Sequence, residues 1–494
     1  MEASEVAELT STSHGAVPVP VPAPALPDGL VAVVKRDCPT CELVAPVLAQ
    51  LAGNATAEPL TVYSQDDPAF PEGLSGVVDD RQLAVSYHHG IETVPTLLRV
   101  REGRETERIE GWSRPAWEAF TGCAGLGPGL ADYRPGCGSL SVDPNLVDEL
   151  RVRFEGGRLR SRRLQLAALE DEMEALFERG WSDGLPVVPP TEARVLRMLE
   201  GTHRAPDEVV AVVPPLLAPA TVEKVAINAV LAGCAPEYLP LVLAAVEAAC
   251  TDVFNIHGLL CTTYFSGPLV IVNGPLSRRI GMASGHNVLG QGNRANSTIG
   301  RALQLVIRNV GGGRPGRDGI DRAAFGSPGK LGWAIAENEQ DLPAGWVPMS
   351  VEAGHPAGTD TVALFAGHGP SAVVDQLSRT ADSLIEAFAR KVSSNFDPKF
   401  FARRIDNMLL VIGPEHGRVF AESGWDKARV RAELNARVID RAGKPSPEPR
   451  WDSPAIVFAG GDAGLFSALI EGWVSGPTGS QMVCRAVTGS DGAH

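Results

Sequence analysis

The sequence predicts an α/β protein in which a small N-terminal domain is followed by a larger α/β domain. Two patterns lead to this expectation. A Cys-x-x-Cys motif stands between an apolar run and a helical pattern near the N-terminus, and three fully apolar stretches farther along each end in a Gly/Pro turn. A chain of 494 residues is also too long for one ordinary hydrophobic core, so two or three domains are expected.

Composition argues against several classes of function. Hydrophobic residues make up 44% of the chain and charged residues 21%, as in ordinary globular proteins. The formal net charge of −15 and the lack of a basic block argue against binding to nucleic acid. No apolar run approaches ~20 residues, so we expect no membrane-spanning segment. An acidic start without a basic flank, and only eight cysteines, predict a cytoplasmic protein with reduced thiols.

Shifts in composition predict the domain boundaries. Val, Pro and Ala alternate over residues 16–27, so residues 1–24 are predicted to be a flexible, proline-rich tail. Residues 25–122 are predicted to form the first domain, and the Gly- and Pro-rich start of residues 123–160 predicts a linker. Residues 161–494 are predicted to be the α/β catalytic domain, opening with a helix over residues 161–180. Its apolar face consists of Leu166, Leu169, Met173, Leu176 and Phe177.

The Cys-x-x-Cys motif comprises Cys38 and Cys41. It follows an apolar run over residues 30–34 and precedes a helical pattern over residues 42–52. A thiol at a helix N-terminus is favoured as the thiolate, and a second thiol two residues farther on can resolve a mixed disulfide. Half a zinc site and two unrelated buried cysteines are the alternatives. Because no second Cys-x-x-Cys exists in the chain, redox chemistry is the favoured interpretation.

The residues that follow predict how the motif is surrounded. Short strands are expected over residues 60–63 and 106–109, with a helix between them over residues 81–87. A Val-Pro-Thr step at Pro95 opens another strand, which suggests a cis-proline loop packed against the two thiols.

This order and spacing resemble thioredoxin over residues 25–122. The resemblance implies a thioredoxin fold, with Cys38 as the attacking thiol and Cys41 as the resolving thiol of a redox-active disulfide Cys38–Cys41. It also implies that Pro95 is the cis residue of a substrate groove, and that a thioredoxin reductase or another thiol reductant is a partner. The sequence departs from the usual thioredoxin pattern at Arg36, where an aromatic residue is common, and between the cysteines, where Pro-Thr replaces Gly-Pro.

The larger domain is expected to contain a sheet that is covered on both faces, because its strands are apolar throughout. These strands are predicted over residues 268–275, 408–414 and 455–462. Helical patterns over residues 239–250 and 381–392 precede the first two strands, and both strands end in Gly-Pro. This repeated order suggests an internal duplication.

A glycine-rich loop over residues 284–296 is the first candidate for substrate binding. It leads into a predicted helix, and Asn293, Arg294 and Arg301 could bind a carboxylate or phosphate there. A structural turn is the alternative. Asp183 lies in a proline-stiffened segment over residues 181–191, where it is either part of a pocket wall or a structural brace.

Further candidates come from helix and strand ends. Lys224 and Asn228 share one helix face at i, i+4, and Cys234 follows that helix. His257 and Cys261 would share a face in a strand or a helix, as an activated nucleophile or as a buried structural pair.

Two more candidates lie outside helices. His416 is expected at a strand-end turn, where α/β sites usually form, and Glu337 with Asn338 could join it. Cys137, flanked by glycines, could shuttle oxidation from the Cys-x-x-Cys pair or be an idle thiol. No complete metal-binding motif is present, so the sequence identifies no metal ligands and no cofactor other than the disulfide, and it leaves open whether the larger domain binds a metal.

The larger domain also resembles the bacterial UGSC-type group, over about residues 135–475. The stretches that carry the resemblance are residues 181–191, 220–234, 413–416 and 459–464. The group is named for a selenocysteine-Gly-Ser-Cys motif, and its members are described only loosely as thiol or seleno oxidoreductases. The nearest match here is Cys137-Gly138-Ser139-Leu140, with cysteine in place of selenocysteine and without the second cysteine.

Together these patterns predict a thiol-dependent oxidoreductase. Its Cys-x-x-Cys domain would serve the fused α/β domain, which acts on a small anionic or sulfur-containing molecule. One alternative is a lyase or hydrolase whose thiols are only kept reduced by the first domain. A second is a non-catalytic docking module joined to a ligand-binding body. A homo-oligomer is compatible with all three.

Overall fold

The computed structural model describes residues 23–54, 58–164, 166, 170–316, 319–394, 407–438, 454–473 and 479–489. It is a mixed α/β protein whose chain divides into two compact units, Met1–Arg158 and Leu159–His494. Residues 1–22 of the predicted tail lie outside the described residues. No helix in the described part of the chain is long and apolar enough to span a membrane.

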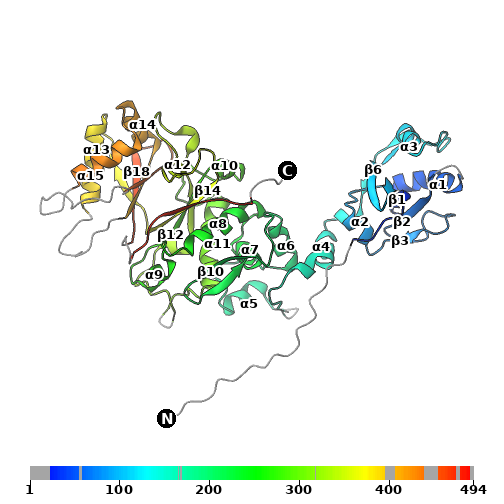
Figure 1. The fold of residues 1–494 in the computed structure, drawn as a ribbon, viewed down its shortest axis with the longest axis horizontal. Coiled ribbons are helices and arrows are strands. Elements are labelled where there is room, and N and C mark those ends of the chain that lie inside the picture. Colours follow the sequence, from blue (N-terminus) through cyan, green and yellow to red (C-terminus); the bar gives the residue numbers. More distant parts are fainter. Residues whose placement is uncertain are drawn as a thin grey trace, which may run out of the picture. The chain divides into compact units, whose positions relative to one another are not determined.

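The first unit is built on a five-stranded sheet of order β3-β2-β1-β5-β6 (Figure 1). Strand β1 pairs in parallel with β2 and antiparallel with β5; β2 and β3 are parallel, and β5 and β6 are antiparallel. The strands are β1 (Gly29–Val34), β2 (Leu60–Ser64), β3 (Val78–Asp79), β5 (Thr96–Arg101) and β6 (Arg104–Glu110). The helices are α1 (Pro39–Gly53), α2 (Ala84–His88) and α3 (Arg114–Thr121).

Helix α1 begins at Pro39, three residues before the helical pattern predicted over residues 42–52. Cys38 is its N-cap, and Pro39 occupies the first helical position, where the missing N–H has no cost. Val44, Val47, Leu48 and Leu51 form its buried face, and all six residues of β1 are buried as well. The sheet and the helix therefore share one core, and the loop between them holds the two cysteines in place.

The segment predicted to be a linker, residues 123–160, instead packs on the first unit as far as Arg158. Its strand β8 (Tyr133–Arg134) pairs with β7 (Trp112–Ser113), and β9 (Cys137–Gly138) pairs with β4 (Thr93–Val94). The 3-10 turns η1 (Leu140–Val142) and η2 (Gly156–Arg158) flank α4 (Val147–Glu155), whose Leu150 and Phe154 pack on Leu83. The prediction of a linker was wrong because Gly and Pro serve here in close-packed turns.

The second unit contains two four-stranded sheets, of orders β13-β12-β14-β19 and β15-β18-β16-β17. The first comprises β12 (Gly267–Asn273), β13 (Trp333–Ala336), β14 (Thr361–Gly367) and β19 (Val483–Ala486). The second comprises β15 (Ser371–Val374), β16 (Met408–Ile412), β17 (Ala455–Phe458) and β18 (Phe466–Glu471). A hairpin of β10 (Val209–Val213) and β11 (Ala218–Thr221) precedes the strands of both sheets in the sequence.

Alternate residues of the strands face different layers. Val270 and Val272 of β12 join a core with helices, whereas Leu269 and Ile271 join a core with Leu409 of β16. The unit is thus four layers deep, with helices outside and the two sheets packed against each other. The strands are covered on both faces, as expected, but one of the two covers is the other sheet.

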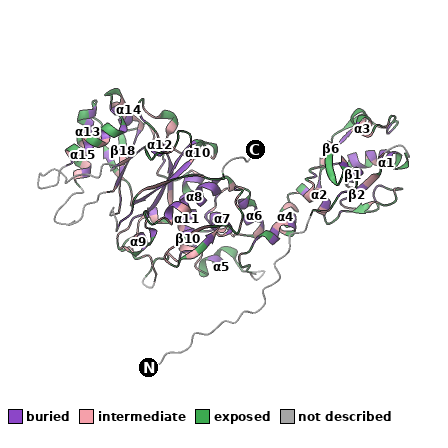
Figure 2. Ribbon diagram, in the orientation of Figure 1, coloured by how far each residue is buried: buried purple, intermediate pink, exposed green. Residues whose placement is uncertain are grey.

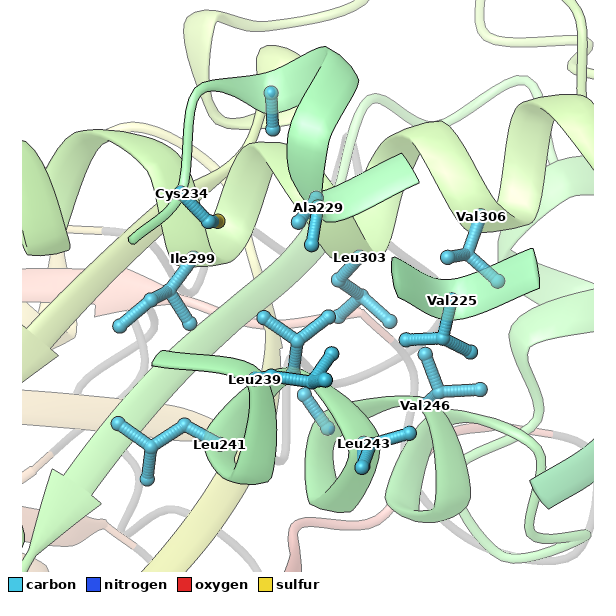
Figure 3. Packing of buried hydrophobic residues seen from close by; sticks show 14 of the residues in the cluster. Val225, Ala229, Cys234, Leu239, Leu241, Leu243, Val246, Ile299, Leu303 and Val306 are labelled. Atoms are coloured by element: carbon cyan, nitrogen blue, oxygen red, sulfur yellow. The ribbon is translucent and has the colours of Figure 1, made fainter. Parts of the chain in front are cut away.

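Helices α7 (Val222–Ala232), α8 (Leu239–Ala249) and α11 (Arg294–Asn309) cover the first sheet. Figure 3 shows their side chains interdigitating, with Val225 of α7, Leu243 of α8 and Leu303 of α11 among them. Helices α13 (Ala381–Ser393), α14 (Pro414–Glu422) and α15 (Lys427–Arg437) cover the second sheet. The remaining helices and turns are α5 (Glu172–Glu178), α6 (Glu192–Leu199), η3 (Pro236–Tyr238), α9 (Ile256–Cys261), α10 (Pro275–Arg279), η4 (Pro328–Leu331), η5 (Glu339–Asp341) and α12 (Met349–Glu352).

The two sheets have the same arrangement of strands. In the first, β12 is parallel to β13 and antiparallel to β14, which pairs antiparallel with β19. In the second, β16 is parallel to β17 and antiparallel to β18, which pairs antiparallel with β15. Strand β15 follows β14 along the chain yet belongs to the second sheet, and β19 follows β18 yet belongs to the first. The sheets therefore exchange their edge strands, an arrangement that an internal duplication would produce.

The predicted helix over residues 161–180 is much shorter in the structure. Helix α5 begins after Asp171, which caps it, and ends at Glu178. Only Ala175 and Leu176 are buried on it, so it is largely exposed, unlike α8 (Figure 2). Met173 and Phe177, predicted to face the core, are exposed, and Leu169 lies outside the described residues.

Candidate functional site

Cys38 and Cys41 lie at the junction of β1 and α1. The Cys38 sulfur accepts a hydrogen bond from the backbone N–H of Cys41 at 3.3 Å, and in its protonated form the thiol donates to the carbonyl of Val94 at 3.6 Å. Cys38 is 1% exposed and Cys41 0%, and both are free thiols. The Val94–Pro95 peptide bond is cis, which confirms the sequence-based expectation for Pro95 and places its loop against Cys38.

A third cysteine joins this pair. Strand β9 pairs with β4 so that Cys137 stands opposite Val94, the residue whose carbonyl accepts from Cys38. Because the Val94 oxygen lies 3.6 Å from Cys38 Sγ, this pairing brings Cys137 close to Cys38, and the two thiols shift each other's pKa. Gly136 permits this approach, because a Cβ atom there would lie 2.2 Å from the Thr93 side chain and 2.9 Å from the Val94 oxygen. Cys137 is partly exposed, in contrast to the other two cysteines.

The three thiols ionise unequally. The pKa of Cys38 is lowered to about 5, first by a hydrogen bond from the Cys41 thiol, against the opposing effect of burial, and then by the Cys137 thiol and the backbone N–H groups of Cys41 and Thr40. Burial and the hydrogen bond to Cys38 raise the pKa of Cys41. Burial raises the pKa of Cys137 too, and its bond to Cys38 adds to this. The cluster thus holds one thiolate between two protonated thiols.

Side-chain contacts fix the segment around Cys137 across the cysteine pair. Lys35 Nζ donates to the carbonyl of Gly138 at 2.8 Å, and Thr40 Oγ1 donates to the carbonyl of Pro135 at 2.6 Å. Arg134 reaches the carbonyl of Pro39 at 3.2 Å. Each contact joins this segment to a residue within or just before the Cys-x-x-Cys motif. These side-chain contacts therefore hold Cys137 in place in addition to the pairing of β9 with β4.

The second unit has a cavity of about 750 Å³ between α5, α6, α7 and the chain around Ser161. Lys224 and Asn228, which the sequence predicts to share one helix face, both line it. Lys224 Nζ donates to the carbonyl of Pro219, and Asn228 accepts a hydrogen bond from Asn309 at 2.8 Å. The cavity therefore combines apolar walls with amide groups and with charged side chains of both signs, namely Lys224, Arg162, Arg163, Arg179, Glu172, Glu192 and Glu223.

The glycine-rich loop does not offer its arginines to a ligand. Arg301 makes a bidentate ion pair with Asp183, with both distances 2.8 Å, and also bonds to the carbonyl of Pro186. Arg294 donates to the carbonyls of Gly233 and Cys234. These contacts favour the structural alternatives for the loop and for Asp183 over an anion-binding loop.

Asn293 and Cys234 likewise have structural contacts. Asn293 caps α11 by accepting from the N–H of Asn296, and it donates to the carbonyl of Gly281. Cys234 is buried, donates to the carbonyl of Thr298, and has its pKa raised to about 12 by burial. A thiol with that pKa is protonated at neutral pH, so Cys234 is not an active nucleophile.

The remaining predicted catalytic residues lie apart in different surroundings. His257 and Cys261 are both exposed on α9, a helix of six residues, which rules out the buried pair that we considered. His416 is fully buried on α14. Its Nδ1 lies 2.8 Å from Ser467 Oγ and its Nε2 lies 3.2 Å from the carbonyl of Asp375, and burial lowers its pKa. Both ring nitrogens are satisfied within the protein, as in a structural histidine.

Sequence reasoning missed a buried ion pair between Glu337 and Lys427. Glu337 follows β13, and its carboxylate accepts from Lys427 Nζ at 2.7 Å and from the N–H of Phe458 at 3.1 Å. It also accepts from Asn273 and from the N–H of Met349, both at 2.7 Å. Lys427 is only 2% exposed. A polar residue at the end of an apolar strand was the available signal, but the lysine is 90 residues away along the chain.

Comparisons with protein-family models, with curated proteins and with solved structures found no match. Within the described ranges, no group of three or more His, Cys, Asp or Glu side chains is arranged to hold a metal ion. The candidate site therefore stands on its geometry, which is most developed around Cys38.

Proposed function

We propose that this protein is a thiol-disulfide oxidoreductase in which a thioredoxin-like N-terminal unit serves the larger α/β unit. One observation carries the proposal: Cys38 and Cys41 lie together at the start of a helix, where the backbone N–H of Cys41 donates to Cys38 Sγ, and this donor helps to lower the pKa of Cys38. A thiolate attacks disulfides, whereas a neighbouring thiol resolves the mixed disulfide that forms.

Strand order supports the thioredoxin part of the proposal. In the five-stranded sheet, β2 and β3 lie on one side of β1 and run parallel to it, and the antiparallel pair β5 and β6 lies on the other side. The Cys-x-x-Cys helix comes directly after β1. A cis-proline before β5 faces the cysteines. The strand exchange between the two sheets of the larger unit supports a second part of the proposal, that this unit arose by internal duplication.

The larger unit would bind the small molecule on which the protein acts. Its cavity of about 750 Å³ is large enough for a metabolite and carries Lys224, which favours an anionic group. Covalent fusion keeps the dithiol at an effective concentration of roughly mM for such a ligand. Free thiols in such a protein suit a reducing compartment such as the cytoplasm, with a thiol reductant as partner.

Replacing each cysteine in turn tests the proposal. In the full chain, Cys38→Ser should abolish reduction of a small aromatic disulfide or of insulin. Cys41→Ser should leave Cys38 able to attack but unable to pair with Cys41, so a disulfide that joins Cys38 to another partner should accumulate and be seen by peptide mass spectrometry. Cys123→Ser is the matched control, because Cys123 is a partly exposed cysteine in the same unit whose contacts are with Asn54 and Thr121. Full activity of Cys38→Ser would refute the proposal.

The role of the cavity is tested separately. Small molecules that co-purify with the full chain would be identified by native mass spectrometry, and Lys224→Met should reduce their occupancy. Equal occupancy in both proteins would remove the cavity from the proposal and leave the cysteine chemistry untouched.

A further inference from the structure

The buried position of Cys38 and Cys41 limits the access of thiols and disulfides from solution. Cys38 is 1% exposed and Cys41 is fully buried, whereas Cys137 is partly exposed. The segment that covers the pair is held by β9–β4 pairing and by the contacts of Lys35 and Thr40. A thiol or disulfide from solution therefore meets Cys137 before it can reach Cys38.

We propose that Cys137 is a third exchange cysteine, which forms a disulfide with Cys38 in place of Cys41 and so carries the redox state of the buried pair to the surface. This inference rests on the proposed function. The geometry that carries it is the pairing of Cys137 with Val94, whose carbonyl oxygen lies 3.6 Å from Cys38 Sγ, together with the hydrogen bonds of Lys35 and Thr40 that hold the Cys137 segment beside the Cys-x-x-Cys motif.

The first step is an exchange within the protein. In the oxidised state, Cys137 gives up its proton and its sulfur attacks Cys38 Sγ. The Cys38–Cys137 bond forms as the Cys38–Cys41 bond breaks, and Cys41 leaves with the electron pair and takes up a proton. Two sulfurs are joined before and after the step, so no external oxidant or reductant is consumed.

The second step connects the protein with thiols in solution. A thiolate from outside attacks the partly exposed Cys137 sulfur, and Cys38 leaves as the thiolate. A second outside thiol then attacks the mixed disulfide at Cys137, releasing an outside disulfide and restoring the Cys137 thiol. Two outside thiols are oxidised and one protein disulfide is reduced. Cys38 suits the role of leaving group because the donors around it stabilise its thiolate.

Two observations on the fold favour exchange over an idle contact. Gly136 is required for β9 to approach β4, because a side chain at this position would overlap Thr93 and Val94. Gln65, which is buried, donates to Ser139 at 2.6 Å and so anchors the residues just after Cys137. The chain thus holds a partly exposed thiol beside Cys38, and a cysteine in a loose surface segment would not be held in this way.

Disulfide mapping tests the exchange directly. The full-length Cys41→Ser variant is oxidised with oxidised glutathione, alkylated and digested. A peptide pair joined through Cys38 and Cys137 is expected, whereas a pair joined through Cys38 and Cys123 is not. Wild-type protein, oxidised partially, should contain both the Cys38–Cys41 and the Cys38–Cys137 linkages. Cys38 that carries glutathione while Cys137 stays open to alkylation would overturn the inference.

A rate measurement tests the role at the surface. Oxidised Cys137→Ser should be reduced by glutathione at least about tenfold more slowly than wild-type protein, because direct attack on Cys38 first requires the covering segment to open. Cys123→Ser should react at the wild-type rate. Serine is nearly the size of cysteine, and Cys137→Ala serves as a second variant if the first is unfolded by circular dichroism.

The two proposals fail in distinguishable ways. If Cys38 forms no disulfide with any partner, the proposed function falls. If Cys38 and Cys41 form a disulfide that glutathione reduces equally fast in wild-type protein and in Cys137→Ser, the function stands and only the role of Cys137 is refuted.

Discussion

Replacing Cys41 with alanine should raise the pKa of Cys38, because the Cys41 thiol contributes most to the lowering. Cys38 has a pKa of about 5. A thiol with this pKa is about 99% ionised at pH 7, against about 3% for an ordinary cysteine with a pKa of about 8.5. A hydrogen bond to a charged group contributes about 1.5–3 kcal/mol, which corresponds to about 1–2 pKa units. Cys38 in Cys41→Ala should therefore titrate about 1–2 units higher than in the wild type.

The assay is alkylation of reduced protein with iodoacetamide between about pH 4 and pH 9. Peptide mass spectrometry reports the rate at Cys38 alone, and the midpoint of the rate profile gives the pKa. Cys41→Ser is the matched control, because its hydroxyl keeps a donor at the same position and should shift the midpoint less. A wild-type midpoint near 8.5, or an unchanged midpoint in Cys41→Ala, would refute the reasoning about the thiolate.

The same ionisation fixes the pH dependence of the reduction potential. Above about pH 5, reduction of the disulfide yields one thiolate and one thiol, so two electrons are taken up with one proton. The potential should then fall by about 30 mV per pH unit, rather than by the roughly 59 mV expected when two protons are taken up. Equilibration with glutathione buffers measures this slope. A slope of about 59 mV at neutral pH would mean that no thiolate is held there.

Three further predictions concern the larger unit. Lys427→Met should lower the free energy of unfolding in urea by about 3–5 kcal/mol, because it leaves the Glu337 carboxylate buried without its cation; a loss below about 1 kcal/mol would contradict this. Asp183→Asn should cost about 1.5–3 kcal/mol through Arg301, whereas its effect on ligand occupancy should be small. Burial keeps the pKa of His416 below its usual value, so the unfolded state binds the proton more readily than the folded state. The free energy of unfolding should therefore fall as the pH drops below about 6.5, and it should fall less in His416→Gln. Thermal unfolding at several pH values measures this difference.

Local patterns predicted the cysteine pair well. The apolar run, the N-cap cysteine and Pro39 all act within a few residues of one another, so the strand-to-helix junction could be placed from sequence. The approach of Cys137 could not, because it depends on pairing with Thr93 and Val94, more than 40 residues earlier. Gly136 was visible in the sequence, but a glycine that permits close approach looks the same as one in a loose linker.

The larger unit shows a second limit of sequence patterns. Apolar runs such as residues 408–412 indicated strands buried on both faces, which is correct. They could not distinguish a cover of helices from a cover by another sheet, because both bury alternate residues equally. The partner of Arg301 was also hidden, since Asp183 lies 118 residues away and an arginine near a glycine-rich loop is equally suited to an anion or to a carboxylate of the protein.

The predicted site residues with groups available for chemistry or binding are distributed between the two units. Arg294, Arg301 and His416 of the larger unit form hydrogen bonds within the protein, and burial raises the pKa of the Cys234 thiol, which keeps it protonated at neutral pH. Among the residues that the sequence singled out, the thiolate lies in the first unit, while Lys224 and its neighbours line the cavity in the second. The proposed electron transfer at Cys38 and the proposed binding beside Lys224 are therefore separable, and the variants above are expected to remove either one without removing the other.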